Sequence, residues 1–152
     1  MLMTGVAGIG KTFQKRLFMD WANGRSNNKI DFIVSLNFSE LNSMSAQSLN
    51  ELIGHSLNVK KPGDYKFDKC KLVFVLDGLE KCELPLDFAK NKDLKDIEEQ
   101  ASMDLLLTNL IKGNLLPSAH LWILSQPSGV DKIPPEYIQR VTECRGIKLY
   151  QF

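Results

Sequence analysis

Eight residues near the start of the chain combine glycine, lysine and threonine in a pattern that suits phosphate binding. They read G-x-x-x-x-G-K-T and are Gly5, Val6, Ala7, Gly8, Ile9, Gly10, Lys11 and Thr12. The glycines let consecutive backbone N–H groups converge on the β-phosphate at the start of a helix. Lys11 is then expected to reach the β- and γ-phosphates, and the Thr12 hydroxyl to ligate Mg²⁺. The pattern predicts that this chain binds a nucleotide.

An acidic residue at the end of a buried strand is the second part of such a site. The run Leu72-Val73-Phe74-Val75-Leu76 is entirely apolar and Asp77 follows it. Such a run is typical of a parallel strand that is covered on both faces and delivers its last side chain to the ligand edge of the sheet. Alone, it more often marks a core strand entering a turn. Together with the phosphate pattern, it predicts that Asp77 holds Mg²⁺ with Thr12.

Alternating strand and helix patterns are expected to position these residues. We predict helices over about 11–23, 49–57 and 103–111, a helical turn after Pro134-Pro135, and strands over about 30–36, 72–77, 120–124 and 141–147. Ser102 is suited to cap the third helix and Gly113 to end it. The order predicts an α/β fold of the P-loop NTPase type, a doubly wound, mostly parallel sheet of about five strands with helices on both faces.

Composition fits one domain over residues 1–152, since 43% of the residues are hydrophobic. A net charge of +1 gives no electrostatic case for nucleic acid, and no apolar run has membrane length. Cys70, Cys82 and Cys144 form no CxxC pair, so we expect reduced thiols in a cytoplasmic protein. His55 and His120 are expected at the surface or at strand ends rather than on a metal.

Several segments resemble the NACHT nucleotide-binding domain of the NOD-like receptors, in the style of the large fish-type expansions. The resemblance covers essentially the whole chain. The segments that carry it are Gly5–Thr12, Asp20-Trp21-Ala22, Val75–Cys82, Leu84–Phe88, Thr108–Ile111, Leu115–Ala119 and Ile133-Pro134-Pro135.

This resemblance implies an ATP/ADP switch rather than a metabolic enzyme. In the family, ADP holds the receptor closed, and exchange for ATP opens it into a signalling oligomer in the cytosol during innate immune responses. ATP or ADP and Mg²⁺ are then the expected cofactors, and self-association or association with other NOD-like receptor chains is expected. By position, Glu80 falls on a second acidic site that helps to place water or metal, which makes it the catalytic candidate. The family's helical, winged-helix, repeat and effector segments are not matched within 1–152, so we expect a truncated domain.

Two departures from the family pattern argue for slow or no hydrolysis. Lys81 stands where the family has a further acid, so a water-orienting role there is lost. The first sensor segment reads Leu124-Ser125-Gln126-Pro127 where the family has Thr-Ser-Arg-Pro. Gln126 at this sensor position donates only neutral hydrogen bonds to a phosphate, unlike arginine. The sequence therefore predicts a weak ATPase at most.

Two other functions stay open. One is a non-catalytic interaction remnant that docks to full-length receptors, which Lys81 and Gln126 favour. The other is a small P-loop enzyme such as a GTPase or nucleotide kinase. Guanine recognition needs Asn-Lys-x-Asp, and the near match Asn91-Lys92-Asp93-Leu94 has the wrong spacing.

Overall fold

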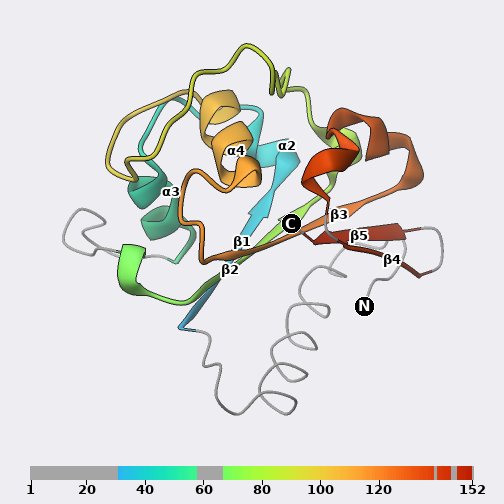
Figure 1. Ribbon diagram of the computed structural model, residues 1–152, viewed down its shortest axis with the longest axis horizontal. Helices are drawn as coiled ribbons and strands as arrows, with labels where there is room; N and C mark the ends of the chain where they lie inside the picture. The colour runs from blue at the N-terminus through green and yellow to red at the C-terminus, as the bar shows by residue number, and fades with distance from the viewer. Residues whose placement is uncertain (1–30, 58–66, 139, 145–146, 152) are drawn as a thin grey trace.

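The computed structural model describes residues 31–57, 67–138, 140–144 and 147–151 (Figure 1). The strands within these ranges are β1 (Phe32–Asn37), β2 (Leu72–Asp77), β3 (His120–Ser125), β4 (Arg140–Cys144) and β5 (Ile147–Gln151). The helices are α2 (Phe38–Leu41), α3 (Leu49–Ser56) and α4 (Met103–Lys112). Short 3₁₀ segments are η2 (Phe67–Lys69), η3 (Leu79–Lys81), η4 (Pro127–Lys132) and η5 (Pro135–Tyr137).

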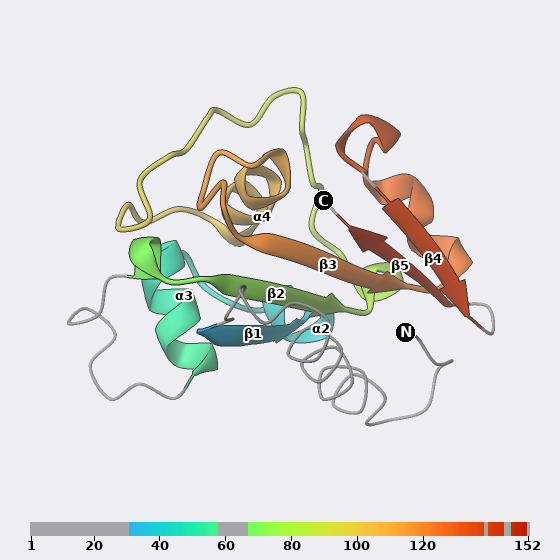
Figure 2. The same ribbon diagram turned by 60° about the horizontal axis from the view of Figure 1, so that its bottom comes forward.

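The described strands form one sheet in the order β1-β2-β3-β5-β4 (Figure 2). β1, β2 and β3 are mutually parallel, and β5 and β4 continue the sheet in antiparallel pairs. This arrangement confirms the predicted α/β fold with a parallel sheet. Asn37 pairs with Asp77, and Asp77 pairs with Leu124, so the carboxyl ends of the three parallel strands meet at one edge.

The end of the chain differs from the prediction of one strand over 141–147. Two strands, β4 and β5, lie there and pair antiparallel with each other. The sequence Arg145-Gly146 between them is a turn signal, and Ile147 and Leu149 begin a second alternation of apolar and polar residues. The prediction of a single strand over 141–147 was wrong because it did not take this turn signal into account.

Alternate residues of the parallel strands form the core together with α2, α3 and α4. The strand residues in this core are Val34, Leu36, Leu72, Phe74, Leu76, Leu121 and Ile123. Val73 and Val75 point to the opposite face of β2 and are 1% and 0% exposed. β2 is therefore buried on both faces, as its apolar sequence predicted. The helix predicted over 11–23 lies outside the described residues.

Side-chain caps fix where the helices begin. Ser48 and Glu51 form a reciprocal capping box at the start of α3. The Ser102 hydroxyl accepts a hydrogen bond from the Leu105 N–H at 3.2 Å, and Gly113 ends α4 with a φ of +83°. The predicted limits of these two helices are thus confirmed to within a residue.

A buried asparagine ties the long loop before α4 to the helix itself. Asn109 is 0% exposed, and its Oδ1 accepts the Leu94 N–H at 2.8 Å. Its Nδ2 donates to the carbonyl oxygens of Lys92 at 3.0 Å and Leu105 at 2.9 Å. These bonds hold a loop that contains little regular structure of its own against the core.

We predict that Asn109→Ala lowers the free energy of unfolding by about 3 kcal/mol, because it leaves buried backbone groups without partners. Urea unfolding followed by circular dichroism measures this loss. Asn114→Ala is the matched control, since Asn114 donates to Asp93 at 3.2 Å and Asn109 at 2.9 Å from a half-buried position. It should cost less than about 1 kcal/mol. Equal losses in the two variants would contradict the assignment of Asn109 as the anchor.

Candidate functional site

The segment Asp77–Glu83, here called the acidic turn, leaves the sheet at the carboxyl end of β2. Gly78 has a φ of +82°, in the region that favours glycine, and its N–H donates to the Leu124 carbonyl at 3.1 Å. This residue bends the chain directly after Asp77 into the 3₁₀ segment η3. Two of its three carboxylates, those of Asp77 and Glu80, therefore lie at the start of the turn, next to the sheet.

The acidic turn meets the segment that follows β3. The Gln126 backbone N–H donates to Glu80 Oε2 at 3.3 Å, and the Ser125 hydroxyl donates to the Gln126 carbonyl at 2.7 Å. The structure thus brings together Asp77, Glu80 and Gln126, which the sequence singled out separately. The contact is made by the backbone of Gln126, which is independent of its side-chain identity.

The charges of this turn suit a cation. Partial burial of the carboxyl group, followed by the negative charge of Glu80, raises the pKa of Asp77 above its ordinary value. Lys81 and the Gly78 backbone N–H act in the opposite direction. A divalent cation beside Asp77 would offset both the burial and the repulsion. Carboxylate oxygens are also the ligands that Mg²⁺ prefers, so the residues present fit this metal.

The described residues do not complete a metal site by themselves. No cluster of three or more His, Cys, Asp or Glu side chains suited to a metal occurs among them. Mg²⁺ in nucleotide sites usually keeps few protein ligands and takes others from phosphates and water. A pair of carboxylates at the sheet edge is consistent with that pattern.

Residues 1–151 match the family model of the NACHT domain. The chain belongs to the NACHT family. This NACHT domain is 36% identical to mouse Protein NLRC3 over 96% of the chain, and 35% identical to human NLR family CARD domain-containing protein 3 over 93%. It is 27% identical to human NACHT, LRR and PYD domains-containing protein 3 over 88%.

The chain spans only 13–14% of the length of these relatives. The match confirms the resemblance drawn from the sequence. NACHT domains have a P-loop NTPase fold, which implies nucleotide binding by this chain. The phosphate-binding residues predicted for the NACHT domain, Gly5–Thr12, lie outside the residues that the structure describes.

The structure shows how Cys82, His55 and His120 are placed. Cys82 is a buried free thiol, and burial raises its pKa above the ordinary value, so it remains protonated near neutral pH. His55 and His120 are exposed, in the last turn of α3 and at the start of β3. No helix in the described ranges is long and apolar enough to cross a membrane.

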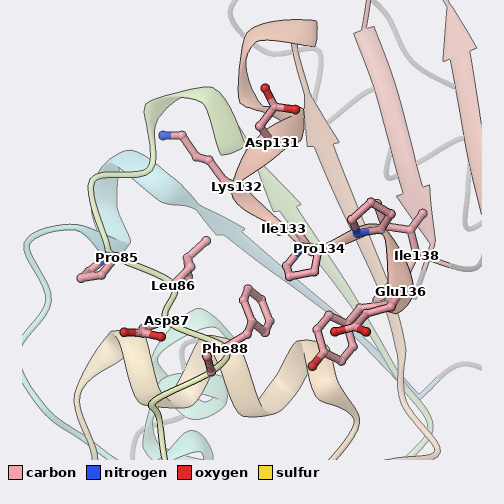
Figure 3. Close-up of a pocket in the computed structure, with 13 residues that line it drawn as sticks. Pro85, Leu86, Asp87, Phe88, Asp131, Lys132, Ile133, Pro134, Glu136 and Ile138 are labelled. Atoms are coloured by element: carbon pink, nitrogen blue, oxygen red, sulfur yellow. The ribbon is translucent and has the colours of Figure 1, made fainter.

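A cavity of about 630 Å³ lies beyond the acidic turn, between residues 85–89 and 131–138 (Figure 3). Its lining is mostly apolar, and the rings of Phe88 and Tyr137 stack with centroids 5.0 Å apart. Asp87, Asp131 and Glu136 add acidic groups. It contains none of the predicted site residues of the NACHT domain, so we do not assign the nucleotide to it.

No pattern in the sequence indicated a role for Gly129, which packs against the acidic turn. A Cβ atom at this position would lie 2.7 Å from the Glu80 nitrogen and 2.9 Å from its Cα, and it would also collide with Ser125 Oγ. Backbone atoms cannot move aside as a flexible side chain can. Only glycine therefore allows η3 and η4 of the NACHT domain to approach this closely.

We predict that Gly129→Ala destabilises the domain by about 2 kcal/mol, because the added methyl group overpacks this contact. Thermal and urea unfolding measure the loss, and backbone amide exchange at residues 79–83 should rise. The double variant Gly129→Ala with Ser125→Ala, compared with Ser125→Ala alone, is the control, since it removes the side-chain collision and leaves the backbone one. It should recover a minor part of the stability. A Gly129→Ala variant as stable as the wild type would contradict this prediction, because it would show that the acidic turn can move away from residue 129 at no cost in stability.

Proposed function

We propose that this chain is the ATP-binding NACHT module of a NOD-like receptor-type innate immune signalling protein in the cytoplasm. It acts as an ATP/ADP switch with slow or no hydrolysis. The observation that carries the proposal is the acidic turn, with Asp77 and Glu80 held at the carboxyl edge of a parallel sheet beside Gln126. The match of residues 1–151 to the NACHT family supports it.

Each predicted site residue has one role in this proposal. The backbone of Gly5–Gly10 and the Lys11 ammonium bind the phosphates, and Thr12 and Asp77 hold Mg²⁺. Glu80 orients water or metal. The bound metal would neutralise phosphate charge, and the protein groups would position the phosphates and the metal.

The acidic turn also supports the slow hydrolysis that we propose. Glu80 Oε2 accepts the Gln126 N–H at 3.3 Å, so one oxygen of this carboxylate already has a backbone partner. Lys81, in place of a further acid, is exposed on the same turn. No second carboxylate therefore stands beside Glu80 on this turn at position 81 to orient the attacking water.

Lys81 and Gln126 also favour one alternative, a non-catalytic remnant that docks to full-length receptors. A small P-loop enzyme is less well supported, because Lys81 and Gln126 both remove groups that speed phosphoryl transfer. Self-association that depends strongly on nucleotide would argue against the remnant and for the switch.

We predict that Lys11→Ala reduces ATP affinity by about tenfold or more, because a charged hydrogen bond to phosphate is lost. Asp77→Asn should keep Mg²⁺-free binding and lose the gain in affinity that Mg²⁺ provides. Calorimetric titration with ATP and ADP, with and without Mg²⁺, measures both effects. Lys95→Ala, an exposed lysine in the loop before α4, is the control and should bind as the wild type does. Unchanged affinity in Lys11→Ala would overturn the phosphate-binding assignment.

We predict that Lys81→Glu combined with Gln126→Arg raises the rate of ATP hydrolysis by about tenfold or more, since a second acid and a charged sensor are restored. Phosphate release under saturating ATP and Mg²⁺ measures the rate. Adding Lys11→Ala to the double variant should return the rate to background, which excludes a contaminating ATPase. A wild-type rate equal to that of the double variant would refute this account of the departures.

A further inference from the structure

Two side chains from distant parts of the chain form hydrogen bonds with the backbone of the acidic turn. Asn42 is the residue directly after α2. Its Nδ2 donates to the Lys81 carbonyl at 2.8 Å, and its Oδ1 accepts the Glu83 N–H at 2.8 Å. One carboxamide therefore fixes a donor and an acceptor of the turn at once, across 39 and 41 residues of sequence.

The second of these side chains belongs to the segment after β3. Lys132, the last residue of η4, donates a hydrogen bond from its ammonium group to the Cys82 carbonyl. Figure 3 shows its side chain extending away from Ile133 and Pro134, toward the turn. The three successive residues Lys81, Cys82 and Glu83 thus each bond to a side chain from outside the turn.

The turn needs such support because it has little order of its own. η3 is three residues long, and the 3₁₀ bonds at its end are Lys81 N–H to Gly78 at 2.9 Å and Cys82 N–H to Leu79 at 3.0 Å. Segments of this kind have poor hydrogen-bond geometry and no helical cooperativity. The sheet holds Asp77, whereas the direction of the Glu80 carboxylate depends on contacts from outside the turn.

We propose that Asn42 and Lys132 are positioning residues that hold the acidic turn from its two sides and so present Glu80 to the metal beside Asp77, which the sheet holds. This inference rests on the proposed function. Both residues act through the turn's backbone and need no contact with the nucleotide. Groups that orient metal ligands in this way typically change metal affinity by about 10–100-fold when removed.

The test uses the full chain and measures ATP affinity by calorimetry with and without Mg²⁺. Asn42→Ala and Lys132→Met should each reduce the Mg²⁺-dependent gain in affinity by about tenfold, with Mg²⁺-free affinity within about twofold of wild type. Lys132→Arg keeps a donor and should retain the gain. Hydrogen exchange without ligand should rise at the Glu83 amide in Asn42→Ala.

Matched controls separate positioning from general stability. Asn114→Ala also removes a carboxamide that makes two hydrogen bonds, but at the end of α4. Lys95→Met removes an exposed ammonium group from the loop before that helix. Both should retain the Mg²⁺-dependent gain. Should Asn42→Ala fail to fold by circular dichroism, Asn42→Asp keeps the acceptor for Glu83 and should show an intermediate loss.

Three outcomes would overturn the inference. The Mg²⁺-dependent gain is unchanged in Asn42→Ala and Lys132→Met, or it falls equally in Asn114→Ala, or Mg²⁺-free affinity falls by the same factor. If ATP binding by the wild-type chain is lost in Lys11→Ala, any of these outcomes refutes the positioning role and leaves the proposed function intact. A folded wild-type chain that binds no ATP refutes the proposed function, and the inference with it.

Discussion

The parallel pairing of β1, β2 and β3 is the constraint on which the rest of the structure depends. Parallel strands in register bring their carboxyl ends to the same edge, and here the residues at that edge include Asn37, Asp77 and Ser125. β2 is paired on both sides, so a slip of one residue would break its register with β1 and β3 together and exchange the side chains of its two packed faces. The acidic turn, the segment after β3 and α2 all begin from this edge.

A short turn on a rigid sheet gives the candidate site its character. The sheet fixes where Asp77 stands, and Gly78 and the close approach of Gly129 fix how the chain leaves it. The orientation of the turn is then set by hydrogen bonds from segments that follow β1 and β3. A site built in this way links the order of the acidic turn to that of both neighbouring connections.

Local patterns were sufficient for much of the fold. The capped and periodic helices α3 and α4 and the apolar strand β2 were predicted from the sequence, since each is determined by residues within a few positions of one another. The four-residue α2 was not predicted, because it is too short to show a period. The division of 141–147 into β4 and β5 was missed because two short strands around a turn resemble one longer strand.

The sequence by itself determined the family and the fold class, and it predicted which residues carry the chemistry, because spacing within the motifs reflects contacts between near neighbours. The roles of Gly5–Thr12 and Asp77 stay predictions, which binding measurements test. Only the tertiary structure showed that Asn42, Lys132 and Gly129 meet the acidic turn. Asn42 and Lys132 bond to it across some 40 to 50 residues, and Gly129 leaves space rather than adding a group. Contacts of that range are made by the pairing of strands and leave no periodic trace in the sequence.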